Sequence, residues 1–245
     1  MTLFYIILAT LAGGVLSVLA AALLALPLIN RLAPRMVAFS IGVLLAASFL
    51  DLLPEASERL APATLGATVL VGLLCFFLLE KLALWRHDHS HQGNDSGPSP
   101  TGMMIVIGDG VHNFVDGILI AAAFLQDPAL GVATATAVIA HEIPQEVGDF
   151  IVLLNAGYSR TRALWLNVLS SLTSVLGGII GYFTLQGSSE IVPYALVIAA
   201  ASFIYIAVAD LLPTLQAQRR LLDTGLQVIL MIAGVSAVVF NHAHH

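Results

Sequence analysis

Long apolar stretches constrain this sequence more than any other feature. A helix needs about 20 consecutive apolar residues to cross the hydrocarbon core of a bilayer, and such stretches recur along the whole chain of 245 residues. They predict eight transmembrane helices, at residues 3–29, 36–54, 62–83, 102–125, 130–156, 163–186, 191–213 and 225–240. We therefore expect an all-α membrane protein with a single transmembrane domain over residues 1–245.

The composition excludes several classes of protein. The chain is 58% hydrophobic and only 10% charged, whereas soluble domains carry about 25% charged residues. A water-soluble enzyme and a disordered chain are therefore excluded. The nine Lys and Arg residues are spread thinly, so there is no basic patch for nucleic acid. The single cysteine, Cys75, excludes a disulfide within the chain.

The positive charges predict the orientation in the membrane. If the eight helices alternate, eight of the nine Lys and Arg residues fall on one side, which the positive-inside rule makes cytoplasmic. These are Arg31, Arg35, Lys81, Arg86, Arg160, Arg162, Arg219 and Arg220, with only Arg59 on the other side. Both termini then face outward from the cell membrane, or from the inner membrane of a Gram-negative cell. The cytoplasmic loop 86–101 carries His87, His89 and His91, which either capture metal ions or are simply solvated.

Short motifs repeat across the predicted membrane. Asp51-Leu52-Leu53-Pro54 and Asp210-Leu211-Leu212-Pro213 end two helices that run in opposite directions. The polar residues of helices 102–125 and 130–156 also share spacings. We therefore expect a 3+2+3 inverted repeat, an organisation typical of secondary transporters. Asp51 and Asp210 are candidate pathway residues, or else solvated helix ends.

The two central helices carry an unusual load of acids. Five carboxylates lie in them, and an ionised side chain at mid-membrane costs about 2.5–3.5 kcal/mol on insertion scales. They are Asp109, Asp116, Glu142, Glu146 and Asp149. The same helices contain no Lys or Arg, so bound cations, protons or water must compensate the charge.

Helical spacing favours bound metal among these choices. Side chains three or four residues apart share a helix face, which pairs His112 with Asp116, Asn113 with Asp116, His141 with Gln145, and Glu142 with Glu146. Two antiparallel helices that face each other would bring these imidazole, carboxylate and amide groups to one point. Imidazole with carboxylate and amide oxygen, and no thiolate, suits a labile divalent transition metal. Asp109, Glu146 and Asp149 are then candidates for supporting or pathway roles.

The same residues carry a family resemblance. His112-Asn113-Phe114-Val115-Asp116-Gly117 resembles the HNFxDG motif of ZIP metal transporters, and residues 141–149, His-Glu-Ile-Pro-Gln-Glu-Val-Gly-Asp, resemble their HExPHExGD motif. The resemblance implies a single transporter domain that moves divalent metal into the cytoplasm, with metal as substrate and no cofactor. It also implies a one- or two-metal centre formed by His112, Asn113 and Asp116 of one helix with His141, Glu142 and Gln145 of the other. Gln145 replaces the usual second histidine. Zinc is therefore the first expectation, and iron, manganese and cadmium stay open.

Two functions other than metal transport fit parts of the same pattern. Residues 141–145 nearly spell the HExxH motif of zinc proteases, but Gln145 breaks it, and we expect no enzyme. A proton-coupled transporter of another substrate would use the same carboxylates, but the paired histidines argue against it. The Gly177 and Gly181 pair predicts close helix packing, either internal or in a homodimer.

Overall fold

The computed structural model is helical throughout the parts of the chain that it describes, residues 1–19, 26–88, 100–188, 190–216 and 221–242, apart from short turns. Its α-helices are α1 (Thr2–Leu11), α3 (Leu26–Ala46), α4 (Leu53–Ser57), α5 (Pro62–Asp88), α6 (Pro100–Gln126), α7 (Pro128–Asn155), α8 (Arg160–Leu185), α9 (Val192–Tyr205), α10 (Leu212–Gln216) and α11 (Leu221–His242). Three π-helical segments extend them, η1 (Ala12–Leu16), η2 (Ala47–Leu52) and η3 (Ile206–Leu211).

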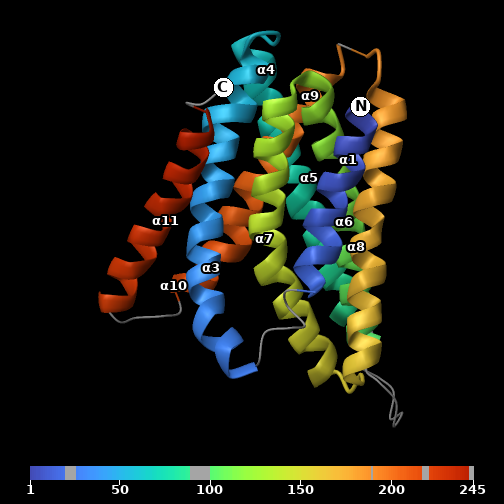
Figure 1. Cartoon of the computed structure of the whole chain (residues 1–245), viewed down its shortest axis with the longest axis vertical. Helices are drawn as coiled ribbons and strands as arrows, with labels where there is room; N and C mark the ends of the chain where they lie inside the picture. The colour runs from blue at the N-terminus through green and yellow to red at the C-terminus, as the bar shows by residue number, and fades with distance from the viewer. Residues whose placement is uncertain (20–25, 89–99, 189, 217–220, 243–245) are drawn as a thin grey trace.

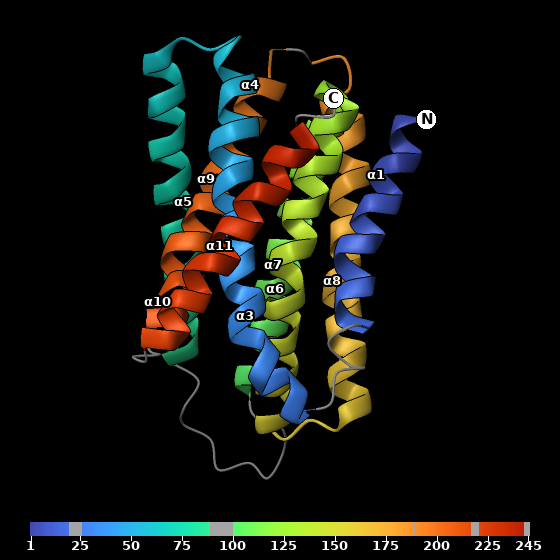
Figure 2. The same ribbon diagram turned by 60° about the vertical axis from the view of Figure 1, so that its left-hand side comes forward.

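The long helices run up and down in one bundle (Figure 1). The first turn of α1 and the last turn of α11 lie at the same end, and α3, α6 and α8 all begin at the opposite end (Figures 1 and 2). The principal contacts join α6 to α8, α3 to α11, α6 to α7, α5 to α9 and α3 to α7. The central pair, α6 and α7, is thereby enclosed by helices from both ends of the sequence.

The helices have the length and apolarity that a membrane requires. Six of the described helices could cross a bilayer by these criteria, so the all-helical membrane class is confirmed at that level. Helix α7 is long enough, but Glu142, Glu146 and Asp149 lower its apolarity. Helix α11 contributes the shorter apolar segment Thr224–Phe240. Eight spans and an outward position for both termini remain proposals.

One predicted helix boundary is wrong. The sequence predicts separate spans at residues 3–29 and 36–54, but α3 already begins at Leu26 and continues through Asn30 and Pro34, which are residues typical of a turn. Membrane helices tolerate an internal proline when neighbouring groups satisfy the carbonyl that it frees. Residues 20–25, which precede α3, lie outside the described residues.

The repeated Asp-Leu-Leu-Pro motif adopts the same local structure twice. Asp51 lies in η2 and Asp210 in η3, and each π-segment is followed by a five-residue α-helix with proline at its second position. Proline has no N–H to continue the α-helical hydrogen-bond pattern, and π-bulges often occur at functional sites. The motif is therefore a repeated local structure as well as a repeated sequence.

Glycines allow α6 and α8 to approach closely. A Cβ atom at Gly177 would lie 2.0 Å from the carbonyl oxygen of Phe114, and one at Gly181 would lie 3.0 Å from the Cβ of Ala121. No side chain fits at the first position without moving backbone. Of the two roles expected for this glycine pair, the structure uses it for packing inside the chain.

Candidate metal centre

The candidate centre lies where α6 and α7 cross the middle of the bundle. Helix α7 is fixed at its start by Asp127, whose carboxylate accepts hydrogen bonds from the N–H groups of Ala129 and Leu130 at 2.7 and 3.1 Å. The two helices are antiparallel and in contact (Figures 1 and 2). The polar faces predicted from the sequence can therefore meet.

Four side chains converge at one point. His112, Asp116, His141 and Glu142 each offer a ligand atom, and these four atoms lie within 4.8 Å of one another. The two Nε2 atoms are 3.3 Å apart. The Nε2 atom of His141 lies 3.1 Å from Asp116 Oδ2 and 3.6 Å from Glu142 Oε1. Such separations allow a single small cation to contact all four groups.

The backbone of α7 orients one imidazole. His141 Nδ1 lies 3.0 Å from the carbonyl oxygen of Ala137, one helical turn earlier. A hydrogen bond at this position requires a proton on Nδ1, so in the neutral ring the lone pair is on Nε2. That lone pair faces the carboxylate oxygens and the second imidazole. A cation resolves the repulsion between these electron-rich atoms.

Proline in α7 also helps to place the centre. Pro144 cannot donate to the carbonyl oxygen of Ala140, four residues earlier. The hydroxyl of Ser40 in α3 donates a hydrogen bond to that oxygen instead. The link pins α3 to α7 beside His141, so the freed carbonyl is satisfied by the neighbouring helix.

The two amides predicted as ligands make other contacts. The amide nitrogen of Asn113 donates to Asp109 Oδ1 at 3.0 Å, and the amide nitrogen of Gln145 donates to the same oxygen at 3.2 Å. Asn113 and Gln145 therefore hold the carboxylate of Asp109. Their role as metal ligands stays a prediction.

A second group of carboxylates lies beside the first. Asp109, Glu142 and Glu146 also offer ligand atoms within 4.8 Å of one another, and all three are buried. Ser171 of α8 donates its hydroxyl to Glu146 Oε1 at 2.7 Å. Glu142 belongs to both groups, so the two are contiguous.

Burial makes this concentration of acids costly. Asp116, Glu142 and Glu146 are fully buried, and α6 and α7 contain no Lys or Arg. Within the part of the chain that the structure describes, neither oxygen of Asp116 or of Glu142 has a hydrogen-bond partner. Unpaired buried charge is strongly unfavourable, so the arrangement requires cations or protons.

The other predicted site residues are not members of the two ligand groups. Asp51 is buried in η2, Asp210 is exposed in η3, and Asp149 is partly buried in α7. His87 is in the last turn of α5. His89 and His91 fall outside the described residues, so nothing follows for metal capture by the loop.

Sequence reasoning missed the contribution of α8. Asn167, Ser170, Ser171 and Ser174 are all buried and have the spacing i, i+3, i+4, i+7 of one helix face. Asn167 donates to the backbone carbonyl oxygen of Glu146 at 3.2 Å. This polar stripe in an apolar helix was the available signal.

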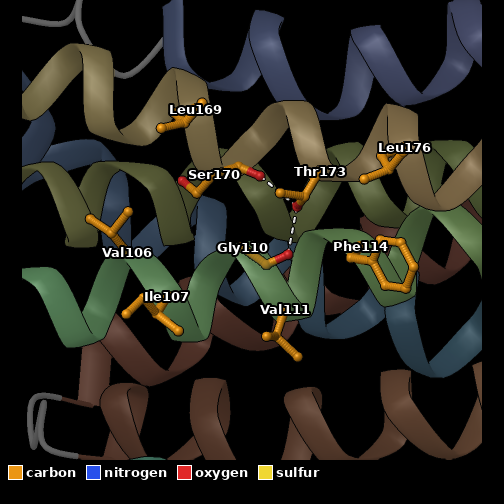
Figure 3. Close-up of a pocket in the computed structure, with 9 residues that line it drawn as sticks. All are labelled: Val106, Ile107, Gly110, Val111, Phe114, Leu169, Ser170, Thr173 and Leu176. Atoms are coloured by element: carbon orange, nitrogen blue, oxygen red, sulfur yellow. Dashed lines mark hydrogen bonds between the residues drawn. The ribbon is translucent and has the colours of Figure 1, made fainter.

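A groove between α6 and α8 is not part of the centre. Its walls are mainly apolar, and Thr173 lies there with its hydroxyl 2.5 Å from the carbonyl oxygen of Gly110 (Figure 3). Its lining residues are Val106, Ile107, Gly110, Val111, Phe114, Leu169, Ser170, Thr173 and Leu176. It offers no imidazole or carboxylate, so it does not suit a metal ion.

Comparison with known proteins gives a consistent result. The family model described as ZIP Zinc transporter matches residues 85–242, which include both ligand groups. Zinc transporter ZIP13 of Pongo abelii is 32% identical over 220 residues, covering 84% of this chain and 65% of that protein. Zinc transporter foi of Drosophila melanogaster is 39% identical over 167 residues, covering 64% of this chain and 24% of that protein.

The human relative Zinc transporter ZIP10 is 38% identical over 139 residues, which make up 53% of this chain and 17% of that protein. The chain thus spans less than two thirds of the length of each of these relatives.

Proposed function

Because this chain belongs to the ZIP zinc transporter family, we propose that it carries divalent transition-metal ions across a membrane. The proposal is supported mainly by the convergence of two imidazole nitrogens and two carboxylates from α6 and α7. A metal ion is the substrate, and the relatives' names make zinc the first candidate. Iron, manganese and cadmium remain candidates because no thiolate restricts the site to softer ions.

His112, Asp116, His141 and Glu142 are the proposed ion ligands. Imidazole suits zinc and iron, and carboxylate suits the harder manganese ion. A mixed set binds several ions without the very tight retention of a structural zinc site. The 21% exposure of the His112 side chain, against 0% for His141, gives the ion one accessible ligand. Exchange with an aqueous pathway requires such a ligand.

We propose that the ion moves into the cytoplasm. The ends of α5 and the starts of α6 and α8 lie at the end of the bundle opposite to the chain termini (Figure 2). Lys81, Arg160 and Arg162 belong to those helix ends, and positive charge favours the cytoplasmic side. Eight spans, outward termini and a cell-membrane location are parts of the same proposal.

Transport explains the site better than proteolysis does. A zinc protease of the HExxH type needs two histidines on one helix with the glutamate free to activate water. Here the second histidine position is Gln145, whose amide contacts Asp109, and Glu142 lies among the proposed ligands. The relatives are named transporters, and we infer that the chain is not an enzyme.

Metal uptake by proteoliposomes tests the proposal. The purified protein should carry radiolabelled zinc into vesicles, and His141→Ala should reduce the rate on the order of 10²-fold, because the oriented ligand is lost. Glu190→Gln, which removes one exposed acid outside the centre, is the control and should transport normally. Wild-type uptake by the His141→Ala protein would contradict the assignment.

A further inference from the structure

The groove between α6 and α8 is open to the surroundings of the bundle. Its volume is about 370 Å³, and none of its lining residues is charged. Helix α6 forms one wall and α8 forms the other, with Thr173 between them (Figure 3). Val111, Leu169 and Leu176 line the groove and are each more than half exposed. Whatever surrounds the bundle can therefore enter it.

The surroundings of this groove are lipid. Both walls belong to segments that are long and apolar enough to cross a bilayer, Ile105–Gln126 of α6 and Arg160–Leu185 of α8. The wall from Leu169 to Leu176 is about 10 Å long. A narrow, uncharged groove of this length, running along two membrane helices, suits a single acyl chain.

A cation lies in line with the groove on α8. Leu169, Thr173 and Leu176 follow Arg162 at separations that keep all four on one face of the helix. The guanidinium carbon of Arg162 lies 5.2 Å from the centre of the Tyr158 ring. Tyr158 is buried, so this cation–π contact holds the arginine in place. Among the described residues Arg162 makes no ion pair with a carboxylate, which leaves its charge available.

The distances along α8 match the depth of a lipid in one leaflet. At about 1.5 Å per residue, Leu169 lies about 10 Å and Leu176 about 21 Å beyond Arg162. The dimensions of a bilayer place an acyl chain roughly 5–20 Å below its headgroup. Trp165, three residues after Arg162, is exposed, and exposed tryptophan is typical of the boundary between headgroups and chains. If Arg162 lies at headgroup depth, the groove lies at chain depth.

We propose that an anionic phospholipid binds to α6 and α8, with its phosphate at the guanidinium of Arg162 and one acyl chain in the groove. Arginine forms charge-assisted hydrogen bonds with phosphate, and basic groups at the membrane surface attract anionic headgroups. A zwitterionic lipid has no net charge, so the site prefers the anionic one. This binding site goes beyond the transport function, and neither depends on the other.

Fluorescence of Trp165 tests the site. The chain has two tryptophans, so a Trp85→Phe protein keeps only the indole near Arg162. It is placed in vesicles of phosphatidylcholine and phosphatidylglycerol, with bromine on the upper part of the acyl chains of one lipid at a time, because bromine quenches a nearby indole. We expect phosphatidylglycerol to be favoured about fivefold at Trp165, as one surface cation predicts. Equal quenching by the two lipids would overturn the proposal.

Two arginines of α8 provide a matched pair of variants. Arg162→Gln removes the cation in line with the groove and should abolish most of the preference for phosphatidylglycerol. Arg160→Gln removes an equal charge from an exposed position two residues earlier, which about 3.6 residues per turn places on the other side of the helix. That variant should keep most of the preference. Equal losses would indicate attraction to the helix end in general and would refute the site at Arg162.

A third variant tests the groove itself. Val111→Phe puts a larger side chain in the groove, leaves Arg162 in place, and should lose most of the preference. Val132→Phe, at an exposed position of α7 outside the groove, is the control and should keep it. An unchanged preference in Val111→Phe would place the acyl chain elsewhere and contradict the proposal. Absence of quenching by either lipid would also contradict it, since another occupant, such as a second copy of this chain, would then cover this face.

Discussion

The contact between α6 and α8 should be intolerant of a single methyl group at Gly117. A Cβ atom there would lie 1.9 Å from the carbonyl oxygen of Ser174 and 2.7 Å from the backbone nitrogen of Gly178. Neither atom can rotate away, because both belong to the backbone of α8. For Gly117→Ala, the two helices must separate by roughly 1 Å.

That separation should affect both stability and transport. Forcing extra volume into a well-packed interior costs about 1–3 kcal/mol, which lowers the melting temperature by about 2–4 °C per kcal/mol in a chain of this size. Helix α6 carries His112 and Asp116, and α8 carries Ser171, which holds Glu146. A shift of about 1 Å in such a site can cost on the order of 10²-fold in rate.

The matched control is the same substitution elsewhere on α6. A Cβ at Gly108 meets nothing within 4 Å, so Gly108→Ala should be neutral or stabilise the helix by up to about 1 kcal/mol. The assays are thermal unfolding in detergent and zinc uptake by proteoliposomes. If Gly117→Ala matches Gly108→Ala in both, the backbone contact does not hold the centre in place.

Three further predictions concern the ion and its path. Apparent zinc affinity should fall as the pH drops from about 7.5 to 5.5, because imidazole must lose its proton to bind metal; a flat binding titration would contradict a histidine centre. Gln145→His should tighten zinc binding, since imidazole is a better ligand than an amide; unchanged zinc affinity would show that residue 145 does not contact the metal ion. In a Cys75→Ser background, Asp51→Cys and Asp210→Cys should react with impermeant thiol reagents from opposite sides, whereas labelling from one side would refute the topology.

The apolar stretches predicted the helices well because the bilayer fixes both length and composition. They failed at Asn30 to Pro34, where residues typical of a turn lie inside α3. A turn signal reflects local preference, and helix packing around a proline can override it. The acids of α7 predicted a functional site because charged side chains are costly inside a membrane. The same acids lower the apolarity of α7.

Helical spacing together with the family resemblance predicted that His112, Asp116, His141 and Glu142 would converge, and the structure brings them together. Spacing could not distinguish which oxygen or nitrogen of an amide faces which neighbour. The contacts of Asn113 with Asp109 depend on side-chain rotamers and on the distance between α6 and α7. The polar stripe of α8 is visible in the sequence, but its contacts with Glu146 depend on the tertiary packing.

The repeat in the sequence extends to the helix contacts. If the first three spans are related to the last three, α3 corresponds to α9, α5 to α11 and α6 to α7. The contact of α3 with α11 then has its counterpart in that of α9 with α5, and the contact of α3 with α7 has its counterpart in that of α9 with α6, and all four occur. These pairs support the proposed inverted arrangement.

The two halves nevertheless differ, and the difference bears on mechanism. Helix α6 packs extensively on α8, while the corresponding contact of α7 with α1 and η1 is smaller among the described residues. Asp51 is 7% exposed in η2, whereas Asp210 in η3 is exposed, and a carboxylate facing lipid is costly. On the proposed transport function, this unequal exposure predicts an ion path that is open at Asp210 and closed at Asp51. Alternating access requires two related repeats that pack differently. If the two repeats exchange their packing, the path opens to the opposite side of the membrane.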